Sequence, residues 1–316
     1  MFALTFQTSV IAIIQIFLLG TAGYVLVKRA VIGDEGLKLL SHLMVNIFFP
    51  LFIFYQLTHH FDFKAIPFWW VFPLISLGVI LTGAGVSALL LAVFPIKLRN
   101  EFRAVTGMHN AGYLPLLLAT TLPLGEQAGT LYIYILLFIL GFDFCLWSLG
   151  VWLLRRDDIP AMDLRKLINP PLLTMAGTLL LISLGLHKFI PEAVMKPVKI
   201  LGDCALPIAM IVTGGNLAMT KMSNIRKLDI AVVCAGKLLI MPMLGFLFVL
   251  LFKPDPLIAL LIIIQTAVPS ATTLSIIGRY YNTRHQEFVN QAIFVTHVAC
   301  MGTLPVFLTL FGKWVG

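Results

Sequence analysis

The sequence has little charge for its length. Aspartate, glutamate, lysine and arginine make up only 11% of the 316 residues, whereas 59% are hydrophobic and the mean hydropathy is +0.98. A soluble globular chain carries about 25% charged residues and is roughly half apolar. So little charge excludes a soluble globular domain, because a chain this apolar needs a bilayer as its outer solvent.

Catalytic and nucleotide-binding motifs are also missing. There is no P-loop, which argues against ATP-driven pumping, and there is no nucleophile motif. The main acidic cluster, "RRDDIPAMDLRK" (residues 155–166), carries matching basic residues in a loop. The four cysteines fall in apolar runs without metal-binding spacing and are expected to be free: Cys145, Cys204, Cys234 and Cys300. We therefore expect no enzyme, no metal site and no cofactor.

Apolar runs long enough to cross a bilayer fill most of the chain. A transmembrane helix needs roughly 20 apolar residues. This length predicts an all-α integral membrane protein with ten transmembrane helices, covering 7–27, 37–58, 68–94, 101–121, 128–153, 168–187, 195–219, 228–252, 256–279 and 287–312. The first run lacks a small-residue cleavage site, so we interpret it as a retained helix and not a signal peptide.

Lysine and arginine are distributed unequally between the two sides of these spans. One side holds Lys28, Arg29, Lys38, Lys97, Arg99, Arg103, Arg155, Arg156, Arg165, Lys166, Lys221, Arg226, Lys227, Arg279 and Arg284. The other side holds Lys64, Lys188, Lys196, Lys199, Lys253 and Lys313. The positive-inside rule assigns the richer side to the cytoplasm, so both termini are expected outside a plasma (cytoplasmic) membrane. This topology accounts for the net charge of +8 without a nucleic-acid partner.

Helix-breaking and polar residues of the first half of the sequence recur in the second half at a nearly constant separation. Four pairs lie 154 or 157 residues apart: Pro115 with Pro269, Asp143 with His297, Pro50 with Pro207, and Gly20 with Gly177. Five helices per half would invert the second copy. The predicted organisation is a first five-helix repeat at 1–154, a cytoplasmic linker at 155–167 and a second, inverted repeat at 168–316. Inverted repeats are typical of secondary transporters.

Helix breakers sit among polar residues in the fourth and ninth spans. A proline in a helix interior costs ~3 kcal/mol or more, and the freed backbone groups cannot turn to water in lipid. We therefore predict two crossover helices whose N-terminal ends present N–H groups to a substrate near the midplane. The predicted binding residues are Asn110, Tyr113, Pro115, Gln265, Pro269 and Ser270, whereas Pro50, Pro73 and Pro242 are interpreted as simple kinks.

Three ionisable residues lie inside predicted spans. A charge at the bilayer centre costs some 2.5–3.5 kcal/mol on insertion scales, so it normally faces a cavity or a partner. Three roles are open for Lys237: binding an anionic substrate, forming a structural ion pair with Asp143, or carrying a coupling proton. Asp143 is a candidate for a coupling proton or sodium ion. His297 is either its relay partner or a satisfied interior histidine.

Four motifs and their order resemble the auxin efflux carrier family, which includes plant PIN-type carriers and bacterial members often labelled malonate transporters. They are "HNAGYLPLLLA", "GDCALPIAMIVTGGNLAM", "GKLLIMPMLGF" and "QTAVPSATTLSIIGRYYN". The resemblance covers the whole length of the chain. The long cytoplasmic loop of some plant carriers is absent, which favours a bacterial or short-loop type.

The resemblance implies a fold similar to that of bile-acid symporters. It implies a scaffold from spans 1, 2, 6 and 7 and a transport unit from spans 3–5 and 8–10. Within the transport unit, spans 4 and 9 are expected to cross at Pro115 and Pro269. It also makes Asn110 the crossover asparagine and implies a homodimer and organic-anion substrates. Gln265 and Ser270 stand where a second asparagine is expected, so the ligand can differ from auxin.

These observations together predict a secondary transporter of a small, carboxylate-type organic anion with an elevator-like movement, coupled to H⁺ or Na⁺. A membrane-embedded ligand sensor with the same fold is the alternative. It is disfavoured because no soluble output domain follows the tenth span. The identity of the anion, the coupling ion and the direction of transport stay open.

Overall fold

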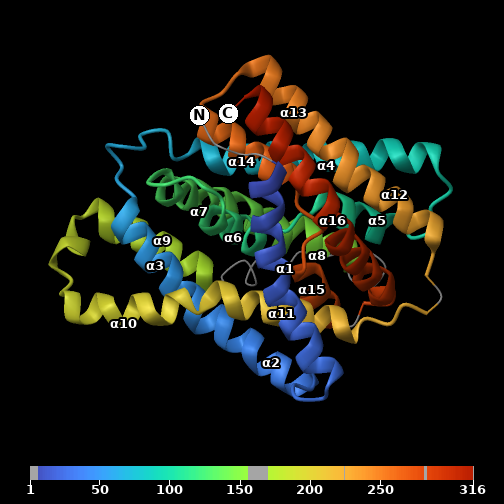
Figure 1. Ribbon diagram of the computed structural model, residues 1–316, viewed down its shortest axis with the longest axis horizontal. Coiled ribbons are helices and arrows are strands. Elements are labelled where there is room, and N and C mark those ends of the chain that lie inside the picture. The colour runs from blue at the N-terminus through green and yellow to red at the C-terminus, as the bar shows by residue number, and fades with distance from the viewer. Residues whose placement is uncertain (1–5, 156–169, 224, 281–282, 316) are drawn as a thin grey trace.

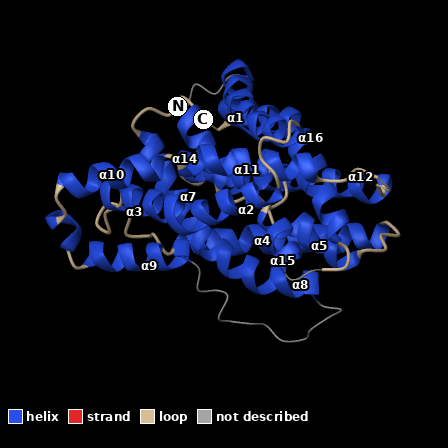
Figure 2. Ribbon diagram, turned by 90° about the horizontal axis from the view of Figure 1, so that it is seen from below, coloured by secondary structure: helices blue, strands red, loops and turns tan. Residues whose placement is uncertain are grey.

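The computed structural model describes residues 6–155, 170–223, 225–280 and 283–315. Within these ranges the regular elements are helices, and a single isolated antiparallel bridge joins His109 to Ser270 (Figures 1 and 2). The linker predicted at 155–167 lies outside the described residues except for its first position.

Seven helical segments of the described chain are long and apolar enough to cross a membrane. They are Phe6–Lys28, Asp34–His60, Val71–Val93, Gln127–Leu154, Glu192–Met219, Lys227–Phe252 and Gln286–Trp314. The other three predicted spans, 101–121, 168–187 and 256–279, contain shorter helices. Two of these, α9 (Pro170–Ser183) and α14 (Pro256–Ala267), are also apolar.

Some of the long segments are continuous and others are composites. α1 (Phe6–Lys28), α4 (Val71–Val93) and α16 (Gln286–Trp314) are single helices. The composites are α2 (Asp34–Leu43), η1 (Met44–Phe48) and α3 (Phe49–His60); α7 (Gln127–Cys145), η2 (Leu146–Gly150) and α8 (Val151–Arg155); α10 (Glu192–Asp203) and α11 (Ala205–Met219); and α12 (Lys227–Ala235), η5 (Gly236–Ile240) and α13 (Met241–Phe252). A short 3₁₀ helix, η4 (Leu186–Phe189), follows α9.

Two of the prolines interpreted as kinks follow turns of π-helix. η1 ends two residues before Pro50, and η5 ends two residues before Pro242. Proline has no N–H and its ring clashes with the carbonyl four residues earlier, and a widened turn relieves that clash. Lys237 lies in η5, so the side chain projects from an irregular turn.

The helices of residues 6–60 and 170–219 pack closely on one another. α1 lies against α11, and α3 lies against α9 and α10. A Cβ atom at Gly214 would overlap the carbonyl group of Gly20, and one at Gly202 would lie 2.9 Å from the Cα atom of Phe52. Small residues of this kind let helix backbones touch inside a membrane.

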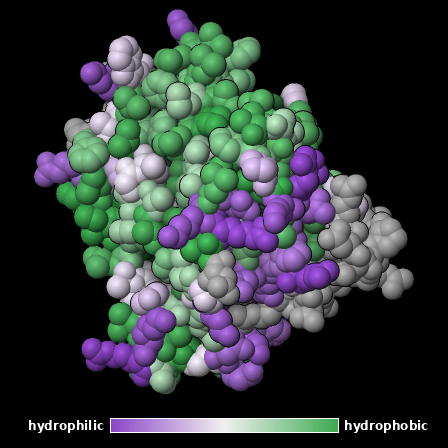
Figure 3. Space-filling model, turned by 90° about the vertical axis from the view of Figure 1, so that its right-hand side faces the viewer, coloured by the Kyte–Doolittle hydropathy of each residue, from purple (hydrophilic) through white to green (hydrophobic). Residues whose placement is uncertain are grey.

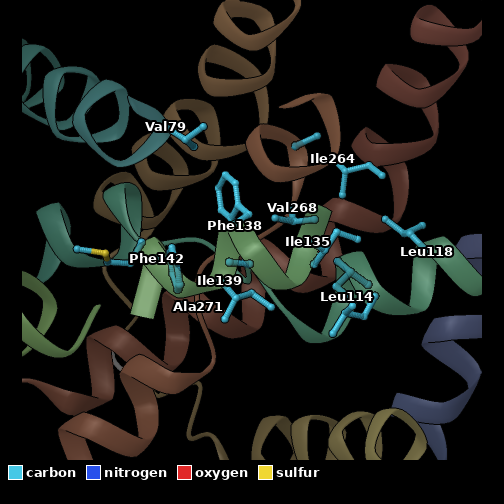
Figure 4. Packing of buried hydrophobic residues seen from close by; sticks show 14 of the residues in the cluster. Val79, Leu114, Leu118, Ile135, Phe138, Ile139, Phe142, Ile264, Val268 and Ala271 are labelled. Carbon is cyan, nitrogen blue, oxygen red and sulfur yellow. The ribbon is translucent and has the colours of Figure 1, made fainter. Parts of the chain in front are cut away.

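The helices of residues 71–155 and 227–314 surround two interrupted segments. α4 packs on α7, and α14 packs on α13 and α16. Val268 and Ala271, which lie in the second interruption, are buried close to Phe138 and Ile139 of α7 (Figure 4). The buried core of this group is therefore centred on the interruptions.

The outer surface is largely apolar, as a bilayer requires. Leu18 of α1, Leu81 of α4 and Leu251 of α13 are all more than half exposed. On the face seen in Figure 3 many hydrophilic residues gather at the centre and lower right, others are scattered at the edges, and hydrophobic residues cover much of the remainder. The start of α1 and the end of α16 lie on the same side of the molecule (Figures 1 and 2).

Candidate functional site

The chain leaves the helical conformation at both of the predicted places. α5 (Arg99–Gly107) and α6 (Tyr113–Thr121) are separated by residues 108–112, which we call the first break. α14 and α15 (Thr273–Tyr280) are separated by residues 268–272, the second break. Pro115 lies in the first turn of α6, where its missing N–H would have had no helical partner, and Pro269 lies in the second break itself. The first break therefore precedes its proline.

The two breaks satisfy each other's backbone groups. The N–H of Asn110 donates to the carbonyl of Pro269 at 2.8 Å, and the N–H of Ala271 donates to the carbonyl of Met108 at 3.1 Å. Backbone groups in a bilayer interior cannot bond to water, so an irregular segment is stable only where protein supplies partners. The crossing of the two breaks supplies them.

Two of the predicted binding side chains hold this crossing together. The amide Nε2 of Gln265 donates to the carbonyl of Ala111 at 3.0 Å, and the hydroxyl of Ser270 donates to the carbonyl of Val105 at 2.6 Å. The Val105 carbonyl belongs to the last turn of α5, where carbonyls lack helical partners. Gln265 and Ser270 are fully buried, and the structure places them in the crossing and not in the neighbouring pocket.

A pocket of about 180 Å³ opens beside the crossing and is shared by both groups of helices. The breaks and the helix starts after them contribute His109, Asn110, Ala111, Gly112, Tyr113, Ala271, Thr272 and Thr273. The remaining walls are Ile139, Phe142 and Asp143 of α7, Trp147 of η2, Val45 of η1, Phe49 of α3 and Pro171 of α9. A mostly apolar lining with a few convergent polar groups is typical of a small-molecule site.

The N-terminal ends of two helices meet at this pocket. The first N–H groups of a helix have no partner within it, and the N-terminus carries a partial positive charge. Gly112, at the N-cap of α6, offers no side chain to bond them, and Thr272 and Thr273 stand at the start of α15. Asp143 is the charged side chain among the lining residues. The pocket therefore combines N–H donors with one carboxyl group.

Comparison with known families identifies the kind of protein that carries this site. A family profile described as "Membrane transport protein" matches two stretches, residues 8–161 and 157–308. The chain belongs to the membrane transport protein family. No curated protein matches the chain.

Membership confirms the resemblance to the auxin efflux carriers. Members of the family are transporters and not enzymes, so the prediction of a non-enzymatic function is confirmed as well. Together with the seven apolar helices of the described residues, the match makes this chain a multi-pass membrane transporter.

His297 of the transporter contacts Asn110 and not Asp143. Its Nδ1 lies 2.8 Å from the carbonyl of Ile293, which can only accept, so Nδ1 carries the hydrogen. Nε2 then accepts from the amide Nδ2 of Asn110 at 3.4 Å. This bond orients the Asn110 amide and leaves its second hydrogen for the pocket. Both ring nitrogens of His297 are therefore occupied by Ile293 and Asn110, and no hydrogen bond joins His297 to Asp143 in the part of the chain that the structure describes.

Lys237 is in η5 and does not line the pocket. The residue is fully buried, its Nζ has no hydrogen-bond partner among the described residues, and no ion pair joins it to Asp143 there. The turn that carries Lys237, η5, packs on α5, α14 and α16. The structure therefore does not form the ion pair that was one of three hypotheses for Lys237.

Most of the pocket residues of the transporter were not among the predicted site residues, and the polar ones among them include His109 and Thr273. His109 is the second residue of the first break, and its ring packs on Phe142 with centroids 4.7 Å apart. Thr273 starts α15. Their position next to a predicted break was the available signal, since residues in a break cannot follow the helical pattern of burial.

Proposed function

We propose that this transporter carries a small carboxylate-type organic anion by secondary transport and binds it at the crossing. The observation that supports this most directly is that α6 and α15 both begin at one pocket. Helix N-termini are ready-made anion sites, because their free N–H groups and their dipole both favour negative charge.

The substrate carboxylate would lie between the two helix starts. The N–H groups of Tyr113, Leu114 and Thr273 and the free amide hydrogen of Asn110 would bond its oxygens, and the Tyr113 hydroxyl is a further donor. The N–H groups of Leu274 and Ser275 already donate to the carbonyls of Ala271 and Thr272. The apolar walls, including Phe49 and Trp147, would cover the remainder of a small substrate. Pro115, Gln265, Pro269 and Ser270 would act by maintaining the crossing.

Because Asp143 lines the pocket, we expect binding of the anion to be coupled to binding of a cation. An ionised carboxyl group and an anionic substrate in the same small pocket repel each other. Binding becomes favourable when Asp143 carries a proton or pairs with a sodium ion, so anion and cation would bind together. Lys237, in η5 against α5 and α14, would add positive charge from outside the pocket.

We propose an elevator-like movement, because the pocket is lined by residues of two separate groups of helices. We assign helices of residues 6–60 and 170–219 to a scaffold and the remaining helices to a transport unit. Val45, Phe49 and Pro171 line the pocket from the scaffold, whereas the breaks line it from the transport unit. The match in two stretches supports ten spans in two inverted five-helix repeats, with boundaries as expected from the sequence. We also propose a homodimer formed through the scaffold, in the plasma membrane, with both termini outside.

A thermal-shift screen tests the proposed substrate class. Purified protein is heated with small mono- and dicarboxylates and with size-matched amines and amides, at pH 5.5 and 7.5, with and without sodium. A ligand at 100 times its Kd stabilises the folded state by about 2.7 kcal/mol. We expect a carboxylate to raise the Tm, more strongly at pH 5.5 or only with sodium. A rise with amines alone, or with none of the compounds, would contradict the proposal.

A further inference from the structure

A second and larger cavity lies between α4 and α13, apart from the pocket at the crossing. Its volume is about 530 Å³. We call it the lateral groove, and it is lined by Val71, Leu74, Ile75, Gly78, Val79 and Thr82 of α4, by Leu244, Gly245 and Phe248 of α13, by Pro254, and by Ile258, Ile262 and Thr266 of α14. It shares no lining residue with the pocket at the crossing.

The lining of the lateral groove offers nothing to a polar ligand. Its two hydroxyl groups are already bonded within their own helices: Thr82 donates to the carbonyl of Gly78 at 2.9 Å, and Thr266 donates to the carbonyl of Ile262 at 2.8 Å. All other lining side chains are apolar. A polar group placed there would lose its bonds to water without replacement, so the occupant is apolar.

The rim of the lateral groove faces the surrounding lipid. Leu74 of α4 and Leu244 and Phe248 of α13 line the groove and are themselves exposed. Both helices belong to apolar segments long enough to cross a membrane. The medium in contact with the rim is therefore hydrocarbon and not water.

The length of the lateral groove matches one leaflet. Along α4 it runs from Val71 to Thr82, about 16 Å at 1.5 Å per residue. That is about half of the ~30 Å hydrocarbon core of a bilayer. Trp70, exposed just before α4, and Lys253, exposed beside the groove-lining Pro254, stand at one end. Tryptophan and lysine are typical of the membrane interface, so the groove descends from that interface toward the midplane.

We propose that the lateral groove binds one acyl chain of a bilayer phospholipid, with the lipid phosphate near Lys253. The floor of the groove includes Thr266, the neighbour of Gln265, whose amide bonds the first break. The bound chain therefore packs on the helix that ends at the crossing. This site does not depend on which solute the transporter carries.

Gly78 allows the groove to be filled without disturbing the helices. A Cβ atom at Gly78 would have no heavy atom within 4 Å, and neither would one at Gly85, which is on the same helix but outside the groove.

Gly78→Phe fills the groove, and Gly85→Phe is the matched control. Delipidated protein is heated with and without dioleoyl phosphatidylglycerol. We expect the lipid to raise the Tm of the wild type and of Gly85→Phe equally, and Gly78→Phe to lose at least half of that rise.

Photolabelling locates the lipid independently of any variant. It uses the wild-type protein, so it tests the proposal even if Gly78→Phe does not fold. Wild-type protein in phosphatidylcholine vesicles receives phosphatidylglycerol with a diazirine in one acyl chain. We expect the label mainly on peptides covering residues 71–82 and 244–266. An unreduced lipid effect in folded Gly78→Phe, or label spread evenly over other lipid-facing helices such as α1 and α10, would overturn the proposal.

Discussion

At the scale of single residues, Asn110 combines two tasks at the crossing. Its backbone N–H bonds the carbonyl of Pro269, and its side chain bonds His297. Only the second hydrogen of its amide is free for a solute. A change of the side chain would therefore remove the proposed ligand contact and leave the backbone contact between the breaks in place.

Replacing Asn110 by alanine should weaken carboxylate binding about tenfold or more. A hydrogen bond to a charged group contributes about 1.5–3 kcal/mol, and 1.4 kcal/mol corresponds to a factor of ten. Calorimetric titration measures the Kd, and expression and the Tm without ligand should change little. Asn46→Ala is the control, because the Asn46 amide bonds the carbonyl of its own helix at His42 and lies outside the pocket. An equal loss in both variants would contradict the assignment.

Replacing Asp143 by asparagine should make carboxylate binding independent of pH. In the wild type, binding is expected to be strongest at low pH, where Asp143 is protonated, and to weaken as the pH rises and the two negative charges repel. Asparagine imitates the protonated form at every pH. The Kd between pH 5.5 and 8 is the measurement. Asp203→Asn, which removes an exposed partner of Lys199, should keep the wild-type profile. A retained profile in Asp143→Asn would exclude Asp143 as the coupling group.

Replacing Lys237 by methionine should raise the Tm and lower transport. A fully buried ammonium group without a hydrogen-bond partner destabilises the folded state, and methionine of similar length removes that cost. Lys196→Met, at an exposed position of α10, should leave both quantities unchanged. A lower Tm would show that the ammonium group is held by a partner, and an unchanged carboxylate Kd with unchanged pH dependence would exclude the cation role.

At the scale of elements, glycine determines which helices can touch. α1 and α11 approach so closely that Gly23 and Gly214 face backbone atoms of the opposite helix. In lipid there is no hydrophobic force between helices, so such packing contributes much of the stability. The broken helices depend on this rigid partner, since α1 also contacts α6 and α16.

Replacing Gly214 by valine should destabilise the protein strongly. The new side chain would overlap the Gly20 carbonyl group, and overpacking typically costs about 1–3 kcal/mol. The Tm of the detergent-solubilised protein is the measurement. Gly177→Val on α9 is the control, since a Cβ atom there meets no heavy atom within 4 Å. Equal Tm values for the two variants would show that α1 and α11 are not in close contact.

At the scale of the whole molecule, the boundary between the two helix groups is the surface along which the proposed movement occurs. The pocket at the crossing lies on it, and so does a narrow pocket lined by Asn216 of α11 and Asn290 of α16. A slide of one group past the other must separate residues across this boundary, whereas residues inside one group keep their distances.

A cross-link across the boundary should abolish transport reversibly. In a background without the four native cysteines, Asn216→Cys and Asn290→Cys are joined by a short thiol-reactive bifunctional reagent that a reductant can cleave. We expect uptake to stop and to recover on reduction. A cross-link within the scaffold, between Gly20→Cys and Met210→Cys, should leave uptake intact. Both positions belong to the scaffold and keep their distance during the movement, and a Cβ atom at Gly20 would lie 3.7 Å from the Met210 side chain. Uptake that survives the boundary cross-link would exclude the elevator movement.

The membrane character and the positions of both breaks could be predicted from the sequence. Composition alone demands an apolar solvent, and polar residues around Pro115 and Pro269 mark places where a helix cannot continue. Family membership was predictable as well, because the motifs that carry it are contiguous stretches of sequence. These are local properties, and they do not depend on how distant segments pack.

Only the tertiary structure decided what each polar residue contacts. Gln265 bonds a backbone carbonyl of the first break, Ser270 bonds one in the last turn of α5, and Lys237 does not line the pocket, although all three stood beside Asn110 among the predicted binding residues. The physical reason is that a helix break frees donors and acceptors without specifying their partners. Those partners come from the second break and the end of α14, more than 150 residues away, and the docking of the two segments determines which side chains still face the pocket.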